Sequence, residues 1–159
     1  MTLRFSRAIA LLIIVFACGS ATAATVPGAT IRSVKGDFDD VRERVVMALE
    51  SRGLVINYTA HIGNMLERTG KDIGRGRQIY GTAEVLEFCS AALSRATMEA
   101  DPRNIVFCPY AIAVYTLPDD PAKVYVAYRK PPAVGSGPSM KALRDVGKLL
   151  DDIVRDALK

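Results

Sequence analysis

The sequence predicts an α+β domain, a two-layer sandwich in which one curved, mainly antiparallel sheet of about five strands carries helices on one face. Runs of alternating residues rich in Val, Ile and Tyr predict strands over residues 30–35, 54–59, 79–89, 104–117 and 123–128. Short turns join some of these runs and helical segments are inserted between others, an order that favours antiparallel pairing. No internal repeat is present, and the length suits one domain.

The first helix is predicted to begin at Phe38. Asp37 is the expected N-cap, because its carboxylate can accept hydrogen bonds from the free backbone N–H groups of the first turn. Asp39 and Asp40 add negative charge at the positive end of the helix dipole. Gly53 is expected to end the helix.

Three further helices are predicted, over residues 62–69, 90–99 and 139–158, with Ser139 as the N-cap of the last one. The Gly- and Arg-rich residues 71–77 between strands are expected to form a mobile loop or a hairpin tip. Apolar residues of the last helix recur at helical spacing and predict a face that packs on the core: Met140, Leu143, Val146, Leu150, Ile153 and Ala157.

The N-terminus has the pattern of a secretory signal peptide. Arg4 and Arg7 precede an apolar run over residues 8–17, and Ala21-Thr22-Ala23 forms a small-residue cleavage site. The apolar run is shorter than the roughly 20 residues that a membrane-spanning helix needs. We therefore expect cleavage after residue 23 and a single domain over residues 24–159 in the periplasm or outside the cell.

Cys18 supports an alternative interpretation of the same segment. It follows Val15-Phe16-Ala17, which fits a loose lipobox, so that export could instead yield an envelope lipoprotein anchored through Cys18. Contact with a membrane is expected only in that case.

The charge balance gives little support to nucleic-acid binding. Arg4 and Arg7 contribute two of the 21 basic residues, and without them the net charge against 17 acidic residues falls from +4 to +2. The densest basic stretch, residues 68–77, is expected to be a solvated loop, with an anion or anionic-lipid patch as the alternative. We expect no nucleic-acid partner.

Several segments, taken in order, resemble a known family. They are residues 38–41 (FDDV) ahead of a helix, residues 87–89 (EFC), and residues 107–110 (FCPY) leading to Val114-Tyr115. Their order and spacing are similar to the bacterial family numbered 302 among the domains of unknown function, over about residues 30–130 and more loosely the last helix. The resemblance implies a compact domain with a curved antiparallel sheet like that of the TATA-binding protein, and a homodimer. It implies no established reaction.

Cys89 and Cys108 are the strongest functional candidates. Cys89 ends one predicted strand and Cys108 lies early in the next, so antiparallel pairing would bring both sulfurs to the same end of the sheet. In an oxidising compartment a structural disulfide is the favoured expectation. Two unpaired, buried thiols are one alternative, and a working redox, sulfur-carrying or soft-metal pair is the other.

Other chemistry has weaker support. His61 is the only histidine, and a soft Cu(I) site that combines it with Met65 and the cysteines is a minor alternative to a plain surface role. Glu84 and Glu87 lie on opposite faces of a predicted strand and do not form a carboxylate pair. We therefore expect no catalytic residues, metal or cofactor.

Tyrosines on the later strands could line a small-molecule cleft or a dimer face. Residues 129–138 are expected to be a plain connector, with a cover over such a cleft as the alternative. The candidate ligand-binding residues are His61, Glu87, Tyr110 and Tyr115.

These observations favour an exported binding or accessory domain with an unknown small ligand or protein partner and no turnover of its own. A link to envelope sulfur or redox metabolism is the preferred setting. The alternative is a thiol-dependent redox carrier or enzyme that uses Cys89 or Cys108.

Overall fold

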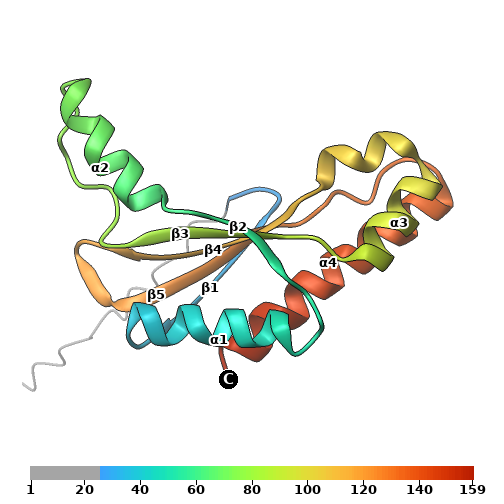
Figure 1. Cartoon of the computed structure of the whole chain (residues 1–159), viewed down its shortest axis with the longest axis horizontal. Helices are drawn as coiled ribbons and strands as arrows, with labels where there is room; N and C mark the ends of the chain where they lie inside the picture. The colour runs from blue at the N-terminus through green and yellow to red at the C-terminus, as the bar shows by residue number, and fades with distance from the viewer. Residues whose placement is uncertain (1–25) are drawn as a thin grey trace, which may run out of the picture.

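The computed structural model describes residues 26–159. The predicted signal peptide and Cys18 lie outside the described residues. Five strands form one sheet in the order β1-β5-β4-β3-β2, and every neighbouring pair is antiparallel (Figure 1). The strands are β1 (Ala29–Lys35), β2 (Ile56–Ala60), β3 (Ala83–Phe88), β4 (Tyr110–Leu117) and β5 (Asp120–Arg129). The predicted α+β class and antiparallel sheet are confirmed.

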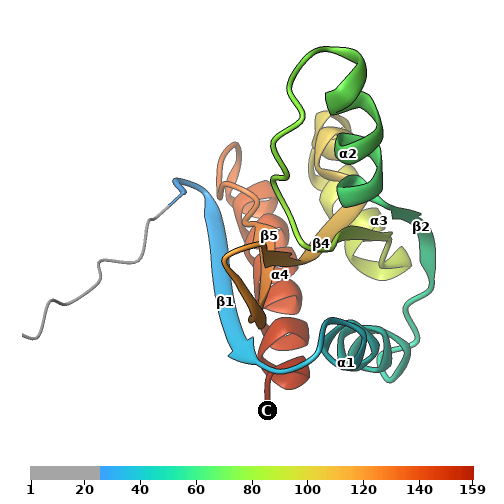
Figure 2. The ribbon, with the colours of Figure 1, turned by 90° about the vertical axis from the view of Figure 1, so that its left-hand side faces the viewer.

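Helices α1 (Phe38–Glu50) and α4 (Gly137–Ala157) lie side by side across one face of the sheet (Figures 1 and 2). Alternate residues of β4 and β5 point toward them and are buried, as a two-residue strand period requires. The predicted apolar face of the last helix packs on this core. The largest fully buried side chains are Phe88, Leu49, Leu86, Ile112, Leu143, Leu150 and Ile153.

Local sequence explains where the main helices begin. The Asp37 carboxylate accepts hydrogen bonds from the backbone N–H groups of Asp39 and Asp40, as predicted. Helix α4 begins earlier than predicted, at Gly137, with Ser136 as N-cap in place of Ser139. Proline is tolerated in the first helical turn because its missing N–H has no partner there, so Pro138 does not delay the helix.

The predicted strand over 104–117 is wrong in its first part. Residues Pro102–Phe107 form a 3-10 helix, η1, and β4 begins only at Tyr110. The Asp101 carboxylate caps this turn by accepting from the N–H of Arg103 at 3.0 Å, and Pro102 presets the helical φ. Local capping thus overrides the β propensity of the apolar residues that follow.

Two other boundaries also differ from expectation. The strand predicted from residue 79 begins at Ala83, because residues 79–82 run as a loop that returns from α2 (Ile62–Asp72). Helix α2 is longer than predicted and passes through Gly70, and the chain reverses closely against this glycine after the helix ends. There the Arg75 N–H donates to the Gly70 carbonyl at 2.7 Å.

The second face of the sheet, called the open face below, has no helix packed across it among the described elements (Figures 1 and 2). Helix α2 and its return loop, residues 62–80, project beyond the body of the fold and are called the arm. Helix α3 (Ala91–Ala100) and η1 extend at the other end and pack on α4. No helix among the described residues is both long enough and apolar enough to span a membrane.

Candidate functional site: a cleft beside a thiol pair

Cys89 and Cys108 come together at one end of the sheet. Cys89 directly follows β3, and Cys108 precedes β4 by one residue, a proline in a cis peptide bond. The neighbouring residues Phe88 and Tyr110 are the last register partners of β3 and β4, so antiparallel pairing brings together the segments just beyond them, which carry Cys89 and Cys108. The two Sγ atoms lie 3.2 Å apart. The predicted convergence of the cysteines is confirmed.

The expected disulfide is not formed in the structure, where both cysteines are free thiols. A separation of 3.2 Å is hydrogen-bond contact, since an S–S bond measures about 2.05 Å. Burial, followed by the hydrogen bond with Cys108, raises the pKa of the Cys89 thiol to about 11. Cys89 therefore remains a neutral thiol near pH 7, a poor state for a nucleophile.

A short polar chain leads from these thiols to Tyr110. The Ser94 hydroxyl lies 3.6 Å from Cys108 Sγ and donates to the Tyr110 hydroxyl at 3.4 Å. The Tyr110 ring is 4% exposed and meets Phe88 edge to face, with ring centroids 6.0 Å apart. Burial is the main cause of the raised pKa of the Tyr110 phenol.

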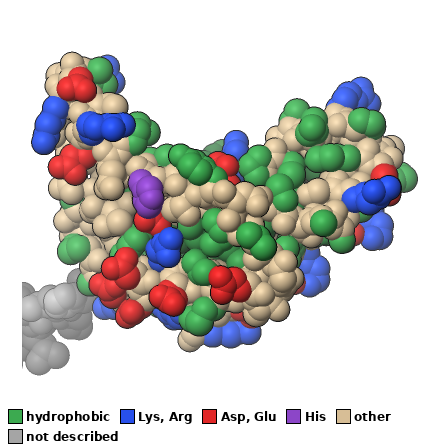
Figure 3. Space-filling view, in the orientation of Figure 1, with side chains coloured by type: hydrophobic (Ala, Val, Ile, Leu, Met, Phe, Trp, Pro, Cys, Tyr) green, Lys and Arg blue, Asp and Glu red, His purple; other side chains and the backbone are tan. Residues whose placement is uncertain are grey.

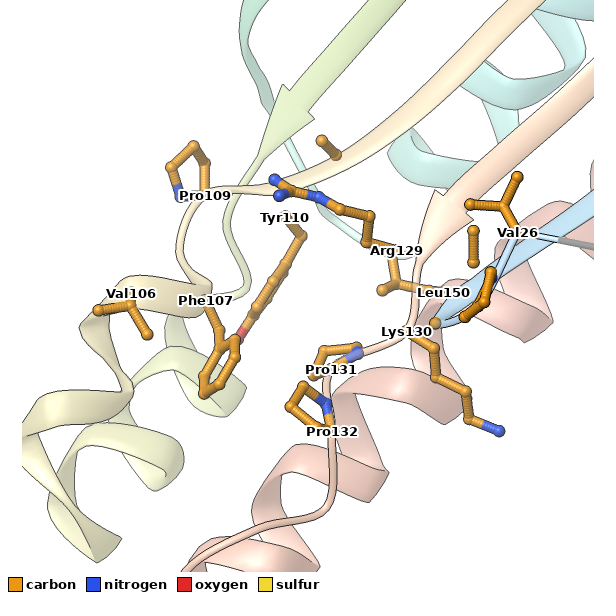
Figure 4. A pocket seen from close by; sticks show the side chains of 14 residues that line it. Val26, Val106, Phe107, Pro109, Tyr110, Arg129, Lys130, Pro131, Pro132 and Leu150 are labelled. Carbon is orange, nitrogen blue, oxygen red and sulfur yellow. The ribbon is translucent and has the colours of Figure 1, made fainter.

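A cleft of about 420 Å³ opens beside this cluster. Figure 4 shows Phe107 and Tyr110 on one side of it and Pro131 and Pro132 on the other. Leu150 of α4 and the N-terminal residues 26–29 complete the lining. The volume lies in the range of small-molecule sites, and the walls are mainly apolar and aromatic.

The charge in the cleft is entirely positive. Arg129 and Lys130 line it, and no acidic residue does. Neither side chain forms an ion pair within residues 26–159. Arg129 extends toward Pro109 along the edge of the cleft (Figure 4). The Lys130 stem passes over Gly147, where an added Cβ would lie 3.6 Å from Lys130 Cγ.

Comparison with known proteins places this fold in a family. The family described as "Domain of unknown function DUF302" matches residues 30–157. The chain belongs to the DUF302 family. A crystal structure of an uncharacterised conserved DUF302 protein from Bacillus stearothermophilus is similar, with a TM-score of 0.68 at 14% identity. The match covers 83% of this chain and 99% of that one. A search of the curated proteins found no match.

His61, another predicted site residue of this DUF302 chain, lies away from the thiols. Its Nδ1 is 3.0 Å from Glu84 Oε1 near the start of β3, whereas Cys89 follows the end of that strand. The Glu84 carboxylate also accepts from Arg42 Nε at 2.6 Å. The structure therefore does not bring His61 and the cysteines together, and this cluster links α1 and β3 to the N-terminus of α2.

Tyr115 and Glu87 lie on the open face, outside the cleft. The Tyr115 ring stacks on Tyr125 at 5.1 Å and meets Tyr80 edge to face at 5.4 Å. Glu87 is half-buried and pairs in register with Ala111. Glu84 points to the opposite face, as the strand period predicted. Within the described part of the chain, no group of three or more His, Cys, Asp or Glu residues is arranged to hold a metal ion.

Of the four predicted ligand-binding residues, only Tyr110 reaches the cleft of the DUF302 domain. Sequence reasoning missed Phe107, Arg129 and Lys130. The expectation of a plain connector over residues 129–138 is wrong at its start, because residues 129–132 line the cleft. Two adjacent basic residues directly before Pro131-Pro132 are the one local signal that could have identified them.

Proposed function

We propose that this DUF302 domain is an exported binding or accessory protein that takes up a small amphipathic anion in the cleft beside Cys89 and Cys108. The observation that carries the proposal is the pairing of an apolar cavity with two cations and no acid. A ligand with an apolar body would displace water from the walls, and its anionic group would pair with Arg129 or Lys130. No turnover is part of this proposal.

Calorimetric titration with decanoate, with decanol as the neutral ligand of the same chain length, tests the proposal. Decanoate is expected to bind, and Arg129→Gln is expected to weaken it about tenfold, the loss of one charge-assisted hydrogen bond. Arg95→Gln, a variant of an exposed arginine on α3, is the matched control and leaves binding unchanged. Equal affinity for decanol, or unchanged decanoate binding by Arg129→Gln, would overturn the proposal.

The thiol pair supports a second part of the proposal, a disulfide in the oxidising envelope. Two sulfurs 3.2 Å apart need only a small approach to bond. Thiol–disulfide exchange with a disulfide donor would remove two protons and two electrons from the pair and reduce the donor to two thiols. Intact mass after alkylation, with and without reductant, should differ by two labels. This pair is also the basis for proposing a setting in envelope sulfur or redox metabolism.

A thiol enzyme is the alternative function, and the geometry favours it less. The raised pKa of Cys89 and the distance of His61 from the pair both work against an activated nucleophile. A reversible dithiol carrier needs no histidine, but its exchange also proceeds through a thiolate, so the raised pKa of Cys89 slows it. Its redox potential, measured against glutathione, separates a labile carrier from a permanent structural bond.

Export itself and the homodimer are also proposals. The mass of protein recovered from the periplasm should correspond to a chain that begins at residue 24, and a lipid mass on Cys18 would instead support the lipoprotein.

The open face supports a homodimer, because its centre is apolar, with Ala113, Ala127 and the stacked Tyr115 and Tyr125 only half-buried. Light scattering after size-exclusion chromatography tests that state.

A further inference from the structure

The arm has an amphipathic helix that is only partly packed against the rest of this chain, with Ile62 and Leu66 half-buried. Helix α2 contacts β3 and its own return loop, and Gly70 is its only buried residue among those described. Three large apolar side chains of the arm remain exposed: Met65, Ile73 and Ile79. Met65 lies on α2, Ile73 at its C-cap and Ile79 in the return loop, and together they form an exposed apolar surface that is open to a partner.

The tip of the arm is an ordered turn that presents an isoleucine. Gly74 takes a positive φ of 70°, and the Arg75 N–H closes on the Gly70 carbonyl at 2.7 Å. These contacts hold Ile73 at the outermost turn with 67% of its surface exposed. An isoleucine fixed in this position is suited to insert into an apolar environment outside the protein, such as a partner surface or a lipid layer.

The net positive charge of the arm indicates which apolar environment suits it. Four exposed basic side chains surround the tip, against two acidic ones, Glu67 and Asp72, and within residues 26–159 none of the six forms an ion pair. Figure 3 shows basic side chains together with apolar ones on this projection. The basic residues are Arg68, Lys71, Arg75 and Arg77.

A second copy of the chain is the competing occupant, and its charge does not complement the arm. The open face carries Lys35, Lys123 and Arg129 around its apolar centre, against the acidic residues Glu87 and Asp120, the register partner of Leu117. The arm and the open face therefore have the same sign. An anionic lipid surface offers both the apolar phase and the opposite charge.

We propose that the arm binds anionic membrane surfaces, with Ile73 entering the headgroup region and the four basic side chains pairing with lipid phosphates. Binding does not depend on the cleft or on the thiol pair. It also differs from anchoring through Cys18, because it is reversible and falls as salt screens the charges.

The chain contains no tryptophan, so one introduced tryptophan reports on a single site. Ile73→Trp places it at the tip. Ile105→Trp is the matched control, since Ile105 is also an exposed isoleucine, at 59%, but lies on η1 at the other end of the molecule. The protein as recovered from its producing cell is mixed with brominated phosphatidylcholine vesicles, with and without brominated phosphatidylglycerol.

The expected result is a blue shift and loss of fluorescence for Ile73→Trp with the anionic vesicles only, and no change for Ile105→Trp. Adding Arg75→Glu and Arg77→Glu should weaken vesicle binding at least about tenfold. Arg95→Glu with Arg103→Glu, a control reversal of two exposed arginines at the other end, should not.

Each of the following outcomes would overturn the proposal. The fluorescence of Ile73→Trp does not change, or changes equally with zwitterionic vesicles. Ile105→Trp is quenched as strongly as Ile73→Trp. Millimolar inorganic phosphate displaces the protein from the vesicles, which would reveal a site for soluble anions. A blue shift that grows with protein concentration in the absence of lipid would assign the arm to a second copy instead. None of these results bears on decanoate binding in the cleft.

Discussion

Asn104 of η1 and Ser139 of α4 are joined by a buried hydrogen bond of 2.9 Å between Asn104 Nδ2 and Ser139 Oγ. The same Asn104 amide donates to the Thr97 carbonyl at 2.8 Å. One buried side chain therefore ties α3, η1 and α4 together behind the Phe107 wall of the cleft. The hydrogen bonds of Asn104 hold this wall in place beyond the end of the sheet.

We expect Asn104→Ala to lower the free energy of unfolding by about 1–3 kcal/mol, because it removes both bonds and leaves buried partners unsatisfied. Urea denaturation measures the change. Asn64→Ala, a variant of an exposed asparagine on α2, is the control and should stay within about 0.5 kcal/mol of the wild type. An Asn104→Ala protein as stable as this control would show that packing alone holds η1 against α4.

Cys89 should react slowly with iodoacetamide at neutral pH, since only the thiolate attacks. Its pKa of about 11 predicts a rate that keeps rising well above pH 9. Peptide mapping of the reduced protein after timed alkylation gives this rate directly. A midpoint near 8.5, the value for an exposed thiol, would contradict the burial of the Cys89 sulfur.

Oxidation of the thiol pair should stabilise the domain by about 3 kcal/mol, the chain-entropy value for a loop of this length. Denaturation of the oxidised and the reduced protein measures the difference. The double variant Cys89→Ser with Cys108→Ser should show no response to reductant. A destabilised oxidised protein would mean that closing the 3.2 Å gap strains β3 and β4.

The sequence predicted the sheet and the thiol pair because both follow from local patterns. Alternation in residues 123–128 and the cap at Asp37 act over a few residues, and antiparallel pairing of β3 and β4 then brings Cys89 and Cys108 to the same end of the sheet. The 3-10 helix η1 was missed because a capped turn at Asp101 outweighed the apolar pattern that follows it.

The cleft could not be predicted in the same way. Its walls come from residues 26–29, 106–111 and 129–132 together with Leu150, which meet only after the sheet and α4 have packed. No periodicity in the sequence relates Arg129 to Phe107. The exposure of the arm is equally a property of the tertiary structure, since the pattern of α2 alone indicates a helix that packs on a core.

Acid sensitivity should depend on Asp151 of α4. Its carboxylate accepts hydrogen bonds from Arg32 at 2.9 Å and from the Tyr128 hydroxyl at 3.1 Å. The bond from Arg32 is the main cause that holds the pKa of Asp151 below its usual value. Because the folded-state pKa lies below the unfolded one, the stabilisation is present above about pH 4 and is lost as the pH falls through the folded value.

We therefore expect Asp151→Asn to lower stability at pH 6 and to flatten its decline as the pH falls below about 4. The side chains are partly exposed, so solvent screening keeps the change at pH 6 to about 1 kcal/mol or less. Glu99→Gln, which breaks an exposed pair on α3, is the control and should retain the acid decline of the wild type. If Asp151→Asn declines as steeply as the wild type, other carboxylates carry the acid response, and the contact between β1 and α4 through Arg32 contributes little to it.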